Sequence, residues 1–169
     1  MKYLRRATQY MRKFYILWAS VLILLLSGCV AKPFTHSDAA TIILKSPKLK
    51  FADTGYLKSS DEMVALELFS ASQAVAKIEV NRLICVEGEG CMSKSRFNAE
   101  YLSAEYPDDL MENILRSNPI YSSKNLIRNQ QGFEQQIVED GVEIEYKITP
   151  RQIYFHDRKN SILVKIKKQ

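Results

Sequence analysis

The chain has 169 residues, of which 46% are hydrophobic and 25% are charged, and its formal net charge is +5. Five of its 24 lysines and arginines, and none of its 19 acidic residues, lie in residues 1–28, so the rest of the chain has 19 charges of each sign. This balance removes the basic footprint that nucleic-acid binding needs, and the remaining length suits one domain rather than two.

The first 28 residues have the pattern of an export signal. A basic stretch without acids precedes an apolar run from Phe14 to Leu26, and two small residues, Ser27 and Gly28, follow it. The run of about 13 residues is shorter than the roughly 20 that span a bilayer. The pattern is typical of a secretory signal peptide.

The four residues Leu26-Ser27-Gly28-Cys29 resemble the bacterial lipobox. The resemblance implies cleavage before Cys29 and acylation of its thiol, which would attach the protein to a membrane. An ordinary signal peptide or an uncleaved anchor is the alternative. Residue 30 is valine rather than aspartate, and by resemblance to known sorting signals this favours the outer membrane. We therefore expect a signal peptide over 1–28, an acylated tether over 29–40 and a single domain over 41–169.

The first part of the predicted domain is rich in strands. Residues 42–44 are a short strand candidate, and Leu49 and Phe51 alternate with other residues. A turn or bulge is expected at Asp53-Thr54-Gly55, before Tyr56-Leu57. The clearest hairpin follows. Val64, Leu66 and Leu68 alternate with other residues, a turn is expected at 70–73, and Ile78 and Val80 alternate in the return strand. Another strand is expected at 83–86.

Two short helices are predicted in the middle, and strands return in the last third. Phe97, Tyr101 and Leu102 share one helical spacing, and a second apolar stripe covers 110–115. Asp108 and Asp109 after Pro107 suit the first turn of the second helix. Strands are expected at 133–138, 142–148, 152–156 and 162–167. The order indicates an α+β fold with an antiparallel sheet.

Two cysteines remain beside Cys29. In an exported, oxidising context Cys85 and Cys91 are expected to form a disulfide across the glycine-rich turn between them; two free thiols are the alternative. His36 and His156 are too distant to complete a zinc cluster with them. We expect no metal and no cofactor.

The sequence does not indicate a nucleophile with a base, a catalytic carboxylate pair or a metal cluster, so we do not predict an enzyme. His36 and His156 each suit a solvated surface position. The lysines of the last strand, Lys165 and Lys167 with Lys168, are most simply its solvated face, with a weak membrane-surface patch as the alternative.

The order of elements resembles the LolA/LolB family. The resemblance rests on a strand ending Leu66-Glu67-Leu68-Phe69, a polar turn, a strand through Ile78-Glu79-Val80, a helix over 109–115 closed by Pro119, and a final hairpin with Ile153-Tyr154-Phe155. It implies a strongly curved antiparallel sheet, an unclosed half-barrel, with two short helices as plug or lid over an apolar cavity. Members of the acylated type are outer-membrane receptors that face the periplasm and take lipoproteins from a carrier.

The resemblance implies binding of acyl chains or lipoproteins without covalent chemistry. The expected cavity lining is Leu66, Leu68, Ile78, Leu110, Ile114 and Ile144, each equally consistent with an ordinary core. Where the receptor has a protruding apolar residue, this chain has Ser70-Ala71-Ser72-Gln73. The rival prediction is an accessory envelope lipoprotein that binds a protein partner through a packed β-rich domain.

Overall fold

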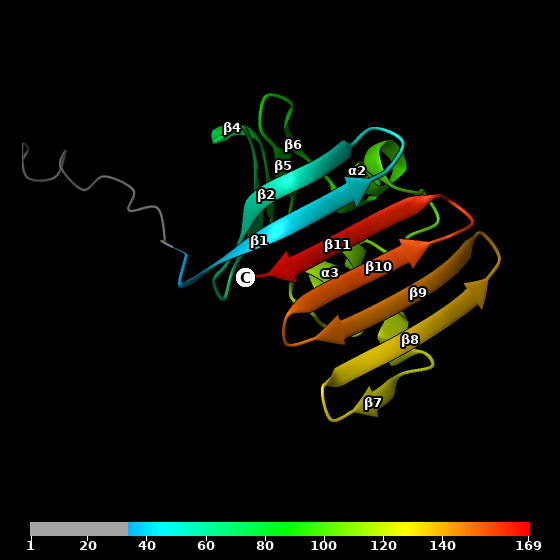
Figure 1. The fold of residues 1–169 in the computed structure, drawn as a ribbon. Coiled ribbons are helices and arrows are strands. Elements are labelled where there is room, and N and C mark those ends of the chain that lie inside the picture. The colour runs from blue at the N-terminus through cyan, green and yellow to red at the C-terminus, as the bar shows by residue number, and fades with distance from the viewer. Residues whose placement is uncertain (1–33) are drawn as a thin grey trace, which may run out of the picture. The chain divides into compact units, whose positions relative to one another are not determined.

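A computed structural model describes residues 34–169, in which most strands and both helices contribute side chains to one hydrophobic core (Figure 1). The predicted signal peptide, Cys29 and the first part of the tether lie outside the described residues. The tether expected through residue 40 is shorter than predicted, because the first strand already begins at His36. Its inward side chain Ala40 is buried, but the stretch before it lacks the apolar alternation that would have revealed a strand.

The described residues form one antiparallel sheet of 11 strands, in the order β6-β5-β4-β3-β2-β1-β11-β10-β9-β8-β7. The strands are β1 (His36–Lys45), β2 (Lys50–Ser59), β3 (Val64–Ser70), β4 (Gln73–Val80), β5 (Ile84–Val86), β6 (Gly90–Met92), β7 (Ile127–Asn129), β8 (Gly132–Glu139), β9 (Val142–Thr149), β10 (Gln152–Asp157) and β11 (Ile162–Lys168). The two edges do not pair with each other. This is the expected α+β fold with an unclosed, curved antiparallel sheet.

The first and last strands pair in the centre of this sheet. Ile42 of β1 lies opposite Ile166 of β11, and both side chains are fully buried. Each of these strands alternates between buried and outward residues, which is the period of two expected for a sheet covered on one face.

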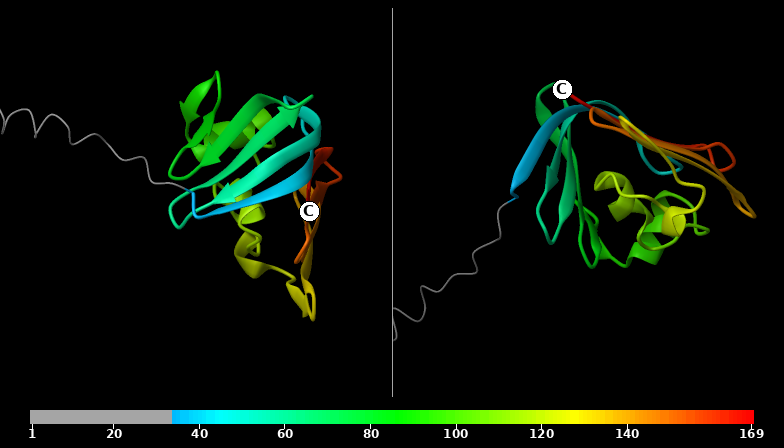
Figure 2. Two further views of the ribbon diagram at one scale, coloured as in Figure 1. Left: turned by 60° about the vertical axis from the view of Figure 1, so that its left-hand side comes forward. Right: turned by 90° about the horizontal axis from the view of Figure 1, so that it is seen from below.

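The sheet curves around residues 93–126, the helical segment between β6 and β7, which lies on its concave side (Figure 2). The turn or bulge predicted at 53–55 is absent, because β2 pairs with β1 there without a register shift. Gly55 of β2 instead allows a close approach to β3. A Cβ atom at this position would lie 2.4 Å from the backbone oxygen of Glu67 on β3 and 2.6 Å from the Ile42 side chain. Only a residue without a side chain fits there.

The two predicted helices are present but short. Helix α2 (Lys94–Tyr101) begins after Ser93, whose hydroxyl accepts a hydrogen bond from the Arg96 backbone N–H. Helix α3 (Leu110–Leu115) begins after the predicted first turn, because 108–109 form a separate turn, and it ends before Asn118. A 3-10 turn, η1 (Tyr121–Ser123), leads to β7. Within residues 34–169, neither helix has the length and apolar character needed to cross a membrane.

The hairpin of β3 and β4 matches the sequence prediction, although its turn is tighter. Only Ala71 and Ser72 connect the strands, and both have positive φ angles of 49° and 67°, as in a two-residue hairpin turn. The edge strands β6 and β7 were not predicted, because three residues are too few to show a period.

Candidate functional site: the interior between sheet and helices

The structure brings all six predicted lining residues into one buried cluster. They come from strands β3, β4 and β9 and from helix α3, and no side chain among them is more than 3% exposed. The residues are Leu66, Leu68, Ile78, Leu110, Ile114 and Ile144. The concave face of the sheet and the apolar stripe of α3 therefore share one interior, as the spacing of these residues predicts.

Aromatic rings fill the part of this interior over β8, β9 and β10. The ring centroids of Phe133 and Tyr146 lie 5.7 Å apart, those of Tyr146 and Phe155 lie 6.3 Å apart, and those of Phe155 and Tyr106 lie 6.0 Å apart. All three pairs have edge-to-face geometry. The Tyr146 hydroxyl donates a 2.9 Å hydrogen bond to the backbone oxygen of Asn118, so this row also ties the helical segment to the sheet.

An apolar crevice marks the junction of the helices with the centre of the sheet. Its lining comes from the end of β1, the turn after it, both helices and the start of β11. The lining includes Leu44, Leu49, Phe97, Leu102, Met111 and Ile162. Its free volume is only about 10 Å³, room for no more than about one water molecule. The interior is closed here in the described conformation.

Two larger hollows lie outside the interior. One, of about 390 Å³, lies at the sheet surface between Ala39, Tyr56, Phe69 and Gln169. The other, of about 670 Å³, lies beside β7 and β8 and includes Ile127 and Val138, which are 61% and 76% exposed. None of the six predicted lining residues belongs to either of these hollows, but Ile144 borders a smaller one of about 100 Å³, beside Glu143 and Arg158.

A small set of polar contacts holds the helical segment on the sheet. The Tyr106 hydroxyl donates a 2.6 Å hydrogen bond to Asp157 Oδ2 at the end of β10. The Gln135 side chain of β8 accepts from the Ile120 N–H at 2.9 Å and donates to the Ile120 oxygen at 3.0 Å. Arg116 donates to the Ser60 backbone oxygen at 2.9 Å. Each contact joins one point of the segment to one strand or turn.

Asp157 is the one carboxylate among these contacts, and its side chain is fully buried. Burial acts to raise its pKa, but hydrogen bonds from Asn160, Tyr106 and backbone N–H groups outweigh burial and hold the pKa below its ordinary value of 3.8. The same burial, with the Asp157 charge, raises the pKa of Tyr106 far above its ordinary value. Both groups therefore keep their donor and acceptor roles at neutral pH.

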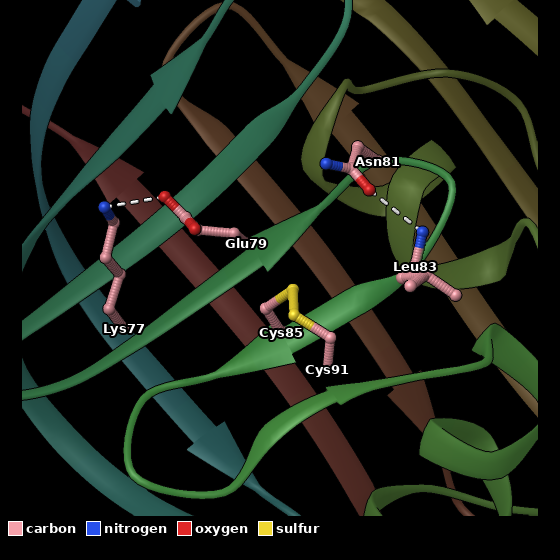
Figure 3. The surroundings of a disulfide bond; sticks show 6 residues. All are labelled: Lys77, Glu79, Asn81, Leu83, Cys85 and Cys91. Carbon is pink, nitrogen blue, oxygen red and sulfur yellow. Dashed lines mark hydrogen bonds and ion pairs between the residues drawn. A yellow bond between two sulfur atoms is a disulfide. The ribbon is translucent and has the colours of Figure 1, made fainter. Parts of the chain in front are cut away.

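The predicted disulfide is present and joins β5 to β6 at one edge of the sheet. Cys85 of β5 and Cys91 of β6 are directly opposite each other, with their Cα atoms 3.9 Å apart, and the bond closes the turn between these strands (Figure 3). In that turn Glu89 accepts a hydrogen bond from the Tyr101 hydroxyl of α2 and lies 3.0 Å from Lys48 Nζ. These two partners lower the pKa of Glu89. The disulfide loop, the turn after β1 and helix α2 thus meet in one polar cluster.

No protein-family model, curated protein sequence or solved structure matches this chain in the comparisons made. The geometry and the sequence therefore carry the functional argument. Residues 34–169 contain no group of three or more His, Cys, Asp or Glu side chains arranged to hold a metal ion. His36 is exposed at the start of β1, and His156 lies at an outward position of β10, 3.4 Å from the Tyr154 hydroxyl.

Sequence reasoning missed the polar contacts that fasten the helical segment. Asp157 begins the stretch Asp157-Arg158-Lys159-Asn160, whose composition is typical of a turn, so the sequence offered a local reason for its acidic side chain. Its partner Tyr106 lies 51 residues earlier. Gln135 likewise occupies an inward, fully buried position in a strand that otherwise alternates normally. A polar residue at an inward strand position was the available signal for this second contact.

Proposed function

We propose that this chain is an acyl-anchored lipoprotein of the bacterial outer membrane that faces the periplasm and binds acyl chains or lipoproteins. In this proposal Cys29 carries the lipid, and the half-barrel performs no covalent chemistry. The observation that carries it is the apolar concave face of an unclosed sheet, covered by a helical segment that a few separate polar contacts hold in place. The resemblance to the LolA/LolB family supports the same reading.

Binding in the interior requires the helical segment to move. The described crevice is too small for an acyl chain, whereas the surfaces on both sides of it are apolar. Separation of the segment from the sheet would expose the six core residues and the aromatic row together. An acyl chain would then replace the contacts that these side chains lose with each other.

A second function is favoured by the tight packing of the same interior. The core residues are almost fully buried, and the crevice leaves about 10 Å³. An accessory envelope lipoprotein that binds a protein partner would have this packed core and no ligand inside. The two proposals differ in whether an apolar ligand enters.

The test is ligand uptake by the folded domain. A chain starting at residue 30, purified from an exporting host with its disulfide intact, is examined by native mass spectrometry and titrated with a fluorescent fatty-acyl probe. A co-purifying lipid mass or saturable probe binding, displaced by unlabelled fatty acid, supports acyl binding. A mass that corresponds to the protein alone, together with no probe binding, contradicts acyl binding and favours the accessory lipoprotein that binds a protein partner.

The anchor is tested separately in the full-length chain. Wild type and Cys29→Ala are expressed in a bacterial host with radiolabelled palmitate. The label should enter the wild type only, and the variant should remain unprocessed or leave the membrane fraction. A Cys29→Ala protein that is still cleaved and membrane-bound would contradict the lipobox assignment.

A further inference from the structure

The outward face of the central strands carries lysines and no acidic residue. On β2, β1, β11 and β10 the buried residues alternate with outward ones, and the helices lie on the opposite side of the sheet (Figure 2). The outward lysines are Lys45, Lys50, Lys58, Lys165 and Lys167, and every other outward position of these four strands is neutral or histidine. We call this surface the lysine face.

Four of these lysines have no ion-pair partner among residues 34–169. They are Lys45, Lys50, Lys165 and Lys167. Acidic partners appear only at the borders of the face, where Lys58 pairs with Glu67 of β3 at 2.7 Å and Lys147 of β9 pairs with Glu145 at 2.6 Å. The centre of the lysine face therefore keeps its positive charge.

The register places these charges close to one another. Lys45 and Lys50 are direct cross-strand partners of β1 and β2, and Lys165 lies diagonally across from Lys45 on β11. Like charges directly opposite each other destabilise an antiparallel sheet. The arrangement therefore gives the sheet no stability by itself, and an external anion would relieve the repulsion.

Segregation of charge, rather than net charge, produces this face. Residues 34–169 contain 18 lysines and arginines and 19 acidic residues. No acidic residue lies at an outward position of β2, β1, β11 or β10, so the lysine face stands out from a nearly neutral domain. Tyr56, which is 41% exposed, and the half-buried Ile43, Tyr154 and Leu163 lie at outward positions between the lysines. Aromatic residues with a polar tip are suited to the boundary between headgroups and acyl chains.

We propose that the lysine face docks the domain on a membrane surface that contains anionic phospholipids. Its cations are all lysines, which act as mobile point charges, whereas a defined carboxylate or phosphate partner is more often held by the fixed fork of arginine. The face extends over four strands, which suits a surface of many equivalent headgroups.

Proximity to the membrane comes from the acylation of Cys29 and rests on the proposed function. Phe34, where the described chain begins, is five residues beyond Cys29. Five residues span at most about 18 Å, so an acylated Cys29 would hold the start of β1 near the bilayer. The lysine face extends from there, from Lys58 opposite Ser37 to Lys45 at the other end of β1. The acyl anchor would then raise the effective concentration of the domain at the membrane surface, and the lysines would orient the domain on that surface.

The test uses the non-acylated chain from residue 30, because the described core and the disulfide both lie within 34–169. Co-sedimentation is measured with vesicles of phosphatidylcholine alone and with vesicles that contain phosphatidylglycerol. The face variant is Lys45→Gln, Lys50→Gln, Lys165→Gln and Lys167→Gln. The control variant removes the same charge elsewhere, by Arg82→Gln, Arg96→Gln, Lys124→Gln and Arg128→Gln.

We expect the wild type and the control variant to bind the anionic vesicles, with binding lost at high salt, and the face variant to bind at least about tenfold more weakly. Equal loss in both variants, or no preference of the wild type for anionic vesicles, overturns the proposal. Binding to an acidic polypeptide such as polyglutamate, without binding to the anionic vesicles, also overturns it and assigns the face to an acidic protein. The face variant should retain any uptake of the fatty-acyl probe. The experiment therefore distinguishes failure of the docking proposal from failure of the acyl-binding proposal.

Discussion

The hydroxyl of Tyr106 donates a 2.6 Å hydrogen bond to the buried carboxylate of Asp157 and so joins the stretch between the two helices to the end of β10. Asp157 also accepts from the Asn160 side chain at 2.7 Å and from the Glu143 backbone N–H at 3.1 Å. One carboxylate therefore fixes the β10–β11 turn, the start of β9 and the helical segment. If the interior opens to admit a ligand, the Tyr106 bond is one that has to break.

Replacement of Tyr106 by phenylalanine should loosen the helical segment without removing its ring from the aromatic row. The variant loses one hydrogen bond to a charged group, so we expect the free energy of unfolding to fall by about 1–2 kcal/mol. Under the acyl-binding proposal, the fatty-acyl probe should enter faster than in the wild type. Urea denaturation and stopped-flow fluorescence measure the two effects. Tyr56→Phe is the matched control, because Tyr56 is an exposed residue at the surface of β2; an equal effect there would contradict the role of the Tyr106 hydroxyl.

Asp157→Asn should destabilise the domain in a pH-dependent way. Because the pKa of Asp157 in the folded state lies below its ordinary value of 3.8, the ionised group stabilises the fold above that pH. We expect the variant to lose about 2–3 kcal/mol at neutral pH, and the difference from wild type to shrink as the pH falls below about 4. Denaturation at several pH values between 7 and 3 measures this. The exposed turn residue Asp140 provides the control variant Asp140→Asn, and a difference for Asp157→Asn that persists unchanged at pH 3 would contradict the assignment.

Removal of the disulfide should weaken the edge of the sheet next to helix α2. The bond closes a loop with a sequence separation of 6 residues, so the entropy of loop closure predicts a loss of about 2 kcal/mol for the double variant Cys85→Ser, Cys91→Ser. Hydrogen exchange should increase in β6 and α2 more than in β10 and β11, because Glu89 would no longer be held beside Tyr101 and Lys48. A titration of thiols in the unfolded, unreduced chain from residue 30 should find none; two reactive thiols would show that the bond is absent.

Gly55→Ala should disturb the packing of β2 against β3. The added Cβ would lie 2.4 Å from the Glu67 backbone oxygen and 2.6 Å from the Ile42 side chain, which is closer than a Cβ normally approaches non-bonded atoms. We expect the free energy of unfolding to fall by about 1–3 kcal/mol because of this overpacking. Thr54→Ala, at the neighbouring outward position, should change stability by less than about 0.5 kcal/mol. Thermal unfolding monitored by circular dichroism compares the two, and similar effects from both variants would contradict a packing role for Gly55.

Residues with a clear period allowed most of the sheet to be predicted. Val64, Leu66 and Leu68 face inward as their alternation indicates, and Ile162, Val164 and Ile166 do the same in β11. His36 to Ala40 gave no such signal, because β1 is held there by its pairing with β2 rather than by large apolar side chains. The same limit applies to β6 and β7, which consist of three residues each.

The contents of the interior were predictable, but its closure was not. Apolar residues such as Leu110 and Ile114 have to be buried somewhere, and a single helix face identifies them as a group. Whether side chains fill the space between helix and sheet depends on contacts between distant residues, such as Tyr146 with Phe155 and Tyr106 with Asp157. No local pattern encodes such a pair.

The pairing of β1 with β11 sets the order in which the molecule can be completed. Because the two strands meet in the middle of the sheet, each half of the sheet is bordered by an unpaired strand until residues 162–168 emerge. A chain shortened before β11 would leave the outward Lys45 and the inward Ile42 of β1 without their neighbouring strand, with an open edge in place of the central ladder. Completion of the sheet therefore waits for the synthesis of β11, and a chain terminated before this strand exposes an incomplete sheet to degradation.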